Sequence, residues 1–182
     1  MTEGRVLLLP GWLDSDAAHW QSHWERLRGW HRVMQSDWLW PKRGDWMARL
    51  EEVLLESEEP AVLVAHSLGC LLVSAWAAHS QHLSRVRGAL LVAPPDIERD
   101  DLPPNLRVWR PILRQPLPFP AIVVTSADDP YSSAEASARV VREWGARHVA
   151  LGARGHLNGA SGLGDWPAGQ AWVGELMAEP VA

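Results

Sequence analysis

The chain has 182 residues, of which 47% are hydrophobic and 21% are charged, and its formal net charge is −5. This balance is typical of one globular domain and excludes a fibrous or wholly disordered chain. The scattered Lys and Arg residues argue against nucleic acid as a partner, because a phosphate backbone requires a basic surface. Cys70 is the only cysteine, which excludes an intrachain disulfide and a metal site built from thiolates.

The N-terminal sequence predicts neither export nor insertion into a membrane. Its first five residues, Met-Thr-Glu-Gly-Arg, lead directly into a short apolar run. This segment has no basic region of the signal-peptide type and is too short to span a bilayer. We therefore expect a cytoplasmic protein without a membrane partner.

Short runs rich in Val, Leu and Ile alternate with helical patterns along the chain. The predicted strands are 5–9, 32–35, 61–65, 88–93, 121–125 and 147–151. The predicted helices are 17–28, 45–56, 68–78, 134–144 and 167–177. Most of the strand runs are continuously apolar, which is typical of strands buried on both faces. Strands that alternate with helices predict an α/β fold around a parallel sheet.

Three segments indicate their place in that fold. Segment 68–78 is apolar on nearly every side, which predicts a helix buried against the sheet centre, directly after a central strand. Segment 45–56 is amphipathic and should form an outer layer. Segment 94–120 contains eight prolines, which forbid a long helix. A segment of this kind is either a wall or lid of a functional site or a plain surface excursion.

Tryptophan is unusually frequent in this sequence. The chain has twelve Trp residues but only one Tyr and one Phe. Seven of the tryptophans lie within the first 46 residues. Because Trp combines a large apolar surface with one N–H donor, we expect most of these residues in the core or in pocket walls.

Ser67 is the candidate nucleophile. It follows the apolar run 61–65, precedes the predicted buried helix, and is flanked by the small residues Ala65 and Gly69. A sharp turn from strand to helix exposes a serine hydroxyl and requires small neighbours, and the pattern matches it although Ala65 replaces the usual first glycine. The alternative is a serine that only caps the helix.

A serine hydroxyl needs a general base and an acid that orients the base. His156 lies in a glycine-rich loop after the last predicted strand, and Asp128 and Asp129 follow the strand at 121–125. The chain order Ser, Asp, His is that of α/β-hydrolases. Pro130 restricts the backbone of the preceding residue and so fixes its carboxylate, which favours Asp129 over Asp128.

The backbone N–H groups of Trp12 and Leu68 are the candidate oxyanion donors. Leu68 begins the helix after the nucleophile, where N–H groups face developing negative charge. Trp12 follows Gly11 at the end of the first predicted strand, and a glycine there allows the backbone to approach a substrate oxygen closely. The alternative for this segment is a simple turn after a strand.

Four sequence segments together resemble a known family, the small serine hydrolases that include YdeN and retinoblastoma-binding protein nine. They are Leu9-Pro10-Gly11-Trp12 with His19-Trp20, His66-Ser67-Leu68-Gly69, Asp128-Asp129-Pro130-Tyr131, and residues 155–158 with 161–166. The resemblance runs nearly end to end. It implies a minimal α/β-hydrolase fold, three-layer α/β/α with about six parallel strands, and a triad of Ser67, Asp129 and His156. We therefore expect residues 1–182 to form a single domain without a separate cap domain.

Other candidate sites are weaker. His19 and His23 lie four residues apart on a predicted helix, but no third metal ligand is evident. Cys70 lies in the predicted buried helix, where an apolar setting keeps a thiol inert. The glycines at 155–164 lack the spacing of a nucleotide-binding loop. We therefore expect no cofactor and no metal.

The predicted function is that of a carboxylesterase-like serine hydrolase acting on small esters through an acyl-enzyme. Without a cap the site should be open and shallow, although segment 94–120 could form one wall. One alternative is a binding or scaffold protein that keeps the hydrolase fold with little turnover. Another is an amide or lactone hydrolase that uses the same triad.

Overall fold

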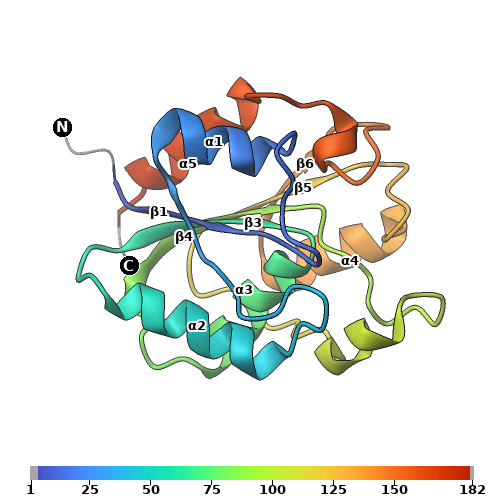
Figure 1. Ribbon diagram of the computed structural model, residues 1–182, viewed down its shortest axis with the longest axis horizontal. Helices are drawn as coiled ribbons and strands as arrows, with labels where there is room; N and C mark the ends of the chain where they lie inside the picture. The colour runs from blue at the N-terminus through green and yellow to red at the C-terminus, as the bar shows by residue number, and fades with distance from the viewer. Residues whose placement is uncertain (1–3, 181–182) are drawn as a thin grey trace.

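A computed structural model describes residues 4–180, which form one parallel sheet with helices on both faces (Figure 1). The strands are β1 (Val6–Leu9), β2 (His31–Arg32), β3 (Ala61–His66), β4 (Val86–Val92), β5 (Ala121–Thr125) and β6 (Arg147–Ala150). They lie in the order β2-β1-β3-β4-β5-β6, and each neighbouring pair is parallel. This arrangement confirms the predicted fold class.

Within residues 4–180, five α-helices cover the sheet. They are α1 (Trp20–Arg28), α2 (Arg43–Leu55), α3 (Leu68–His79), α4 (Ala134–Trp144) and α5 (Pro167–Ala178). Helices α1 and α5 lie on one face, and α2, α3 and α4 lie on the other, as Figure 1 shows above and below the strands. The result is the three-layer α/β/α architecture.

The sheet separates two hydrophobic cores because successive side chains of a strand point to opposite faces. In β1, Leu7 and Leu9 join the core under α2, α3 and α4, whereas Val6 and Leu8 join the core under α1 and α5. Strands of this kind have no polar face, which explains their continuously apolar sequences.

The structure confirms the predicted central strand and the buried helix that follows it. Strand β3 is third of the six strands in the sheet, and all of its residues are buried. Helix α3 follows it directly and is buried from Leu68 to Trp76. Helix α2 packs outside α3 and buries only one side, as its amphipathic pattern predicts.

Two predicted boundaries are wrong by a few residues. Strand β2 has only two residues and ends at Arg32, so most of the predicted strand 32–35 lies outside the sheet. Helix α1 begins at Trp20 instead of residue 17 because Asp16 forms a turn, accepting a hydrogen bond from the Ala18 backbone N–H at 2.9 Å. His19 then caps the helix by accepting the Gln21 backbone N–H at 3.1 Å.

The proline-rich segment is packed onto the molecule. It contains a short 3-10 helix, Pro104–Trp109, instead of an α-helix. Leu106 and Trp109 are buried, and the indole N–H of Trp109 donates to the Pro41 carbonyl at 2.8 Å. The segment is therefore a fixed wall over one end of the sheet.

Most tryptophans are core residues, as expected. Eight of them are buried: Trp20, Trp24, Trp30, Trp46, Trp76, Trp109, Trp144 and Trp166. Trp12, Trp38 and Trp172 are half-buried, and Trp40 is largely exposed. Within residues 4–180, none of the helices has the length and apolar character needed to cross a membrane.

Candidate active site

Ser67 occupies a strained turn between β3 and α3. Its backbone has φ +54° and ψ −121°, a region that residues with a side chain rarely adopt. Its side chain makes no capping hydrogen bond to α3. The cap interpretation of this serine is therefore wrong, and the turn has the geometry of a nucleophile elbow.

Two glycines allow the chain to close tightly around this turn. A Cβ at Gly69 would lie 2.3 Å from the Leu9 carbonyl oxygen. A Cβ at Gly11 would lie 2.9 Å from the Cβ of Ser67 and 3.1 Å from the Leu68 nitrogen. Neither position has room for a side chain, so the end of β1 and the start of α3 are interlocked.

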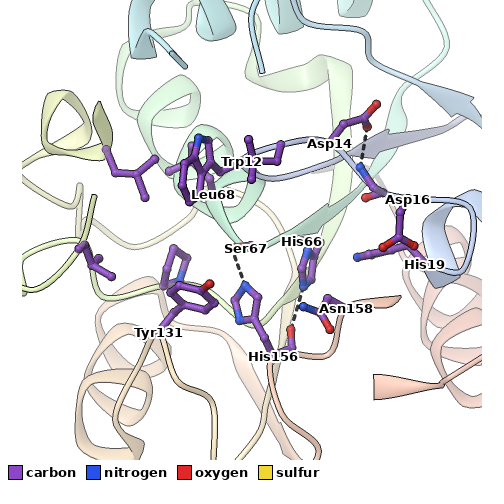
Figure 2. A pocket seen from close by; sticks show the side chains of 15 residues that line it. Trp12, Asp14, Asp16, His19, His66, Ser67, Leu68, Tyr131, His156 and Asn158 are labelled. Carbon is purple, nitrogen blue, oxygen red and sulfur yellow. Dashed lines mark hydrogen bonds between the residues drawn. The ribbon is translucent and has the colours of Figure 1, made fainter. Parts of the chain in front are cut away.

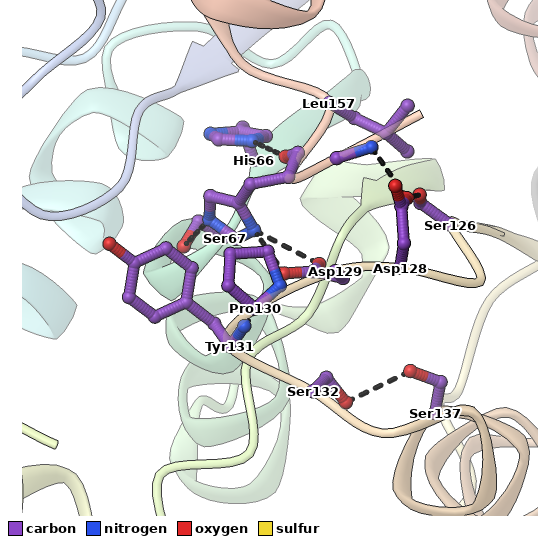
Figure 3. A network of polar contacts seen from close by, with 12 residues as sticks. His66, Ser67, Ser126, Asp128, Asp129, Pro130, Tyr131, Ser132, Ser137 and Leu157 are labelled. Atoms are coloured by element: carbon purple, nitrogen blue, oxygen red, sulfur yellow. Dashed lines mark hydrogen bonds and ion pairs between the residues drawn. The ribbon is translucent and has the colours of Figure 1, made fainter. Parts of the chain in front are cut away.

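The structure brings Ser67, His156 and Asp129 together from three distant parts of the chain (Figures 2 and 3). The Nε2 atom of His156 lies 2.8 Å from the Ser67 Oγ atom. The Nδ1 atom of His156 lies 2.9 Å and 3.0 Å from the two carboxylate oxygens of Asp129. His156 and Asp129 are both buried. This is the arrangement that a serine nucleophile, its base and an orienting acid require.

The two adjacent aspartates have different surroundings. Asp129 is buried beside His156, and its Oδ1 also accepts the Tyr131 backbone N–H at 2.9 Å. Asp128 is exposed and accepts hydrogen bonds from the Gly155 backbone N–H at 2.7 Å and from the Ser126 hydroxyl at 2.8 Å. These two bonds, the first above all, lower the pKa of Asp128. Asp128 thus ties together the loops that carry the acid and the base.

The candidate oxyanion donors lie beside the serine. The backbone N–H groups of Trp12 and Leu68 have no acceptor within the described part of the chain. Both residues line the same pocket as Ser67. A Cβ at Gly11 would lie 3.1 Å from the Leu68 nitrogen, so the segments that carry the Trp12 and Leu68 N–H groups are neighbours. Unpaired N–H groups in a pocket can hold a developing oxyanion.

A pocket of about 460 Å³ surrounds the serine. Its apolar lining residues are Trp12, Leu13, Leu68, Pro95, Leu102 and Leu106. Its polar lining includes Asp14, Asp16, His19, His66 and Asn158. Figure 2 shows Trp12 and Leu68 on one side of Ser67, the apolar side, and Asp16, His19 and Asn158 on the other, the polar side. The proline-rich segment thus contributes a wall of the site, and the pocket has the size and mixed lining of a small-molecule site.

Two buried side chains, whose role the sequence does not indicate, hold the His156 loop in place. The Nε2–H group of His66 donates to the His156 carbonyl at 2.9 Å, and the indole N–H of Trp20 donates to the Leu157 carbonyl at 2.8 Å. Leu157 has φ +52°, a strained value for leucine. Two successive carbonyls are therefore fixed by rigid aromatic donors. The only sequence signal is that both donors lie in segments that already carry the family resemblance.

His19 and His66 form a buried neutral pair next to this loop. Their ring centroids are 4.6 Å apart. Burial lowers the pKa of His19 from 6.5 to about 3, against the opposing effect of Asp16. Burial also lowers the pKa of His66 well below its usual value, and the neighbouring His19 adds to the effect. Both rings are therefore neutral near pH 7.

These histidines predict that the fold loses stability in mild acid. Below pH 6.5 the unfolded chain protonates residue 19, whereas the folded chain does not until about pH 3. The unfolded state therefore binds more protons, and stability falls as the pH falls through this range. We expect His19→Asn, which can still cap α1, to reduce the loss in unfolding free energy between pH 7 and pH 5 by about 2 kcal/mol.

Urea denaturation of the wild type and the variant at both pH values measures this difference. His31→Asn is the control because His31 is exposed, and it should keep the wild-type dependence. Equal losses in the wild type and His19→Asn would contradict the assignment of a buried neutral imidazole at position 19.

The other candidates from the sequence were a pair of histidines as metal ligands and the cysteine. His23 Nδ1 lies 2.8 Å from a carboxylate oxygen of Asp165. His19 Nδ1 instead accepts the Gln21 backbone N–H and caps α1. Across residues 4–180, no three His, Cys, Asp or Glu side chains are grouped to hold a metal. Cys70 is fully buried, and burial raises the pKa of its thiol well above the usual value.

A parallel sheet with a serine at a sharp turn after its central strand defines an α/β-hydrolase. The sequence profile described as serine hydrolase matches residues 6–175. The chain belongs to this family. Its hydrolase class follows from this membership. No curated protein matches the sequence at a significant level.

Solved structures give the same picture. A YdeN-like hydrolase from Pectobacterium atrosepticum is 29% identical, with 98% of this chain and 94% of that chain covered and a TM-score of 0.85. The ydeN gene product from B. subtilis is 20% identical, with 97% and 100% covered and a TM-score of 0.77. A thermophilic esterase from Thermogutta terrifontis is 18% identical, with 96% and 91% covered and a TM-score of 0.67. The last two similarities concern the fold.

Proposed function

We propose that the protein is a carboxylesterase-like serine hydrolase that cleaves small esters through an acyl-enzyme on Ser67. The observation that carries this proposal is the 2.8 Å separation between the Ser67 Oγ and His156 Nε2 atoms inside a pocket. The esterase among the structural neighbours supports it. Water is the only co-reactant, so no cofactor is assigned, and we expect the substrate to be a small cytoplasmic molecule.

The first half of the reaction forms the acyl-enzyme. His156 Nε2 accepts the hydroxyl proton of Ser67 as Oγ attacks the ester carbonyl carbon. The carbonyl oxygen becomes an oxyanion that accepts hydrogen bonds from the backbone N–H groups of Trp12 and Leu68. The ester C–O bond then breaks, and His156 returns the proton to the departing alkoxide, which leaves as an alcohol.

The second half releases the acid by the same steps with water as nucleophile. His156 accepts a proton from water, and the resulting hydroxide oxygen attacks the acyl carbon. The same two N–H groups hold the second oxyanion. The bond to the Ser67 oxygen breaks, and the proton on His156 passes to that oxygen, which restores the free hydroxyl.

Asp129 fixes the imidazole in the required tautomer. Because its carboxylate accepts the proton on His156 Nδ1, Nε2 keeps its lone pair toward the serine. It also stabilises the imidazolium that forms in each half-reaction. The hydrogen bonds that His66 and Trp20 donate to the carbonyls of His156 and Leu157 hold the backbone of this loop, and so keep the imidazole ring of His156 in position.

A fluorophosphonate probe and a substrate panel test the proposal. We expect the probe to label the wild type at Ser67, as read by mass spectrometry of the modified peptide. We expect p-nitrophenyl acetate to be hydrolysed with a higher kcat/KM than a lactone or an aminoacyl p-nitroanilide.

Each alternative has its own outcome. A wild-type chain that ignores the probe and hydrolyses none of the substrates would be a scaffold with the hydrolase fold. A higher kcat/KM on the lactone or the anilide, with labelling at Ser67 retained, would leave the triad in place. The protein would then be assigned as a lactone or amide hydrolase instead of an esterase.

A further inference from the structure

Leu13 combines two unfavourable features at the edge of the pocket. Its backbone has φ +68°, in the left-handed region that favours glycine and asparagine. Its side chain is 54% exposed although it is apolar. An isolated exposed leucine needs no explanation, but strained residues concentrate at functional sites. The strain and the exposure together indicate an apolar ligand that covers Leu13.

Two further exposed apolar residues lie on segments that border the pocket. Leu39 is 53% exposed and Val108 is 56% exposed. Hydrogen bonds hold their segments at the pocket edge, because the Leu39 carbonyl accepts the Trp12 indole N–H at 3.0 Å and the Asn105 side-chain amide at 2.6 Å. Within the wall itself, Leu106 is buried two residues before Val108. Both exposed residues therefore lie on segments that reach the pocket lining, Leu39 through the bond to Trp12 and Val108 through Leu106.

The proposed reaction decides which half of an ester meets this surface. The leaving oxygen must face His156 Nε2, and the chain continues from His156 to Asn158 on the polar side of the pocket. The carbonyl oxygen must face the N–H groups of Trp12 and Leu68, whose side chains belong to the apolar side. An acyl group attached to that carbonyl can then extend past Trp12 to Leu13, the next residue of the pocket lining.

We propose that Leu13, Leu106, Leu39 and Val108 form an acyl-binding surface that selects esters of medium-length fatty acids. This inference rests on the proposed function and narrows its substrate class from small esters to esters with an extended apolar acyl group. Full burial of one methylene group is worth a factor of about four in affinity, and partial cover on an open rim is worth less. Added methylenes therefore increase kcat/KM until the chain passes Val108.

A series of p-nitrophenyl esters from acetate to dodecanoate, kept below the concentrations at which they aggregate, tests the proposal. For the wild type we expect kcat/KM on octanoate to exceed that on acetate by about tenfold or more. Leu13→Asn should lower this octanoate-to-acetate ratio by about fivefold without lowering the melting temperature, because asparagine tolerates the left-handed backbone. The double variant Leu39→Ser/Val108→Ser should lower the ratio by about threefold or more.

The matched control is Leu27→Ser, since Leu27 is 55% exposed on α1 and does not line the pocket. It should keep the wild-type ratio. An unchanged ratio in both rim variants, or an equal fall in the control, would overturn the acyl-binding surface while leaving Ser67-dependent hydrolysis intact. A wild-type chain that hydrolyses none of the esters would instead overturn the proposed function, and this inference with it.

Discussion

Replacement of Ser67 by alanine should lower kcat/KM for p-nitrophenyl acetate by about 10⁴-fold or more, to the level of catalysis by the empty pocket and the backbone donors. The reason is that the Ser67 hydroxyl is the hydrogen-bond partner of the His156 Nε2 atom, at 2.8 Å, and is therefore the group that this base deprotonates. The measurement is steady-state kinetics on purified protein. Fluorophosphonate labelling should disappear in the same variant.

Ser74→Ala is the matched control for this experiment. Ser74 is a buried serine in the same helix, and its hydroxyl donates to the Leu71 carbonyl at 3.0 Å, away from the pocket. We expect this variant to keep activity within about twofold of the wild type, because the lost hydrogen bond affects stability and not the reacting atoms. Activity in Ser67→Ala above about a tenth of the wild-type value would remove Ser67 from the mechanism.

The second large effect should come from Asp129→Asn, which we expect to lower kcat by about 10³- to 10⁴-fold. An asparagine amide can donate to His156 Nδ1, and that bond places the imidazole proton on Nε2. The ring then cannot accept the Ser67 proton. Because the side chain keeps its size inside a buried site, the melting temperature should fall far less than the activity.

Asp128→Asn provides the comparison at the adjacent residue. Its side-chain oxygen can still accept the Gly155 backbone N–H, so the two loops stay connected. We expect a loss of less than about tenfold in kcat, since Asp128 is exposed and does not contact His156. A larger loss in Asp128→Asn than in Asp129→Asn would reverse the assignment of the orienting acid.

Much of the fold could be predicted because its strands have a simple signal. Strands buried on both faces are continuously apolar, and the helix after β3 is apolar on nearly every side. The bounds of short elements could not be predicted, because such elements carry no comparable pattern. β2 contains only two residues, and the start of α1 depends on a turn at Asp16 and a cap at His19 that no periodicity records.

The candidate site likewise contains residues that could be predicted from the sequence and one whose role could not. Ser67, His156 and Asp129 could be proposed because each lies directly after a recognisable strand, and parallel strands end at one edge of the sheet. The preference for Asp129 had a local reason in Pro130. The role of His66 could not be predicted, because its bond to the His156 carbonyl joins residues 90 positions apart.

The pocket wall was the least predictable part. Prolines exclude a helix from segment 94–120 but do not say where the segment lies. Its position depends on long-range contacts such as the bonds from Trp109 to Pro41 and from Asn105 to Leu39. Contacts of this kind arise from tertiary packing, which a single sequence does not encode in any local pattern.

The close packing of Gly11 and Gly69 around Ser67 limits which residues of this enzyme can be substituted. Backbone atoms of Leu9 and Pro10 fill the space at Gly69, and Ser67 with its two chain neighbours fills it at Gly11, so any larger residue at either glycine must displace the chain around the nucleophile. The apolar wall, by contrast, comes from side chains on connecting segments that can be exchanged one at a time. New preferences among substrates can therefore evolve here by single substitutions in the wall, while the reacting groups are inherited unchanged.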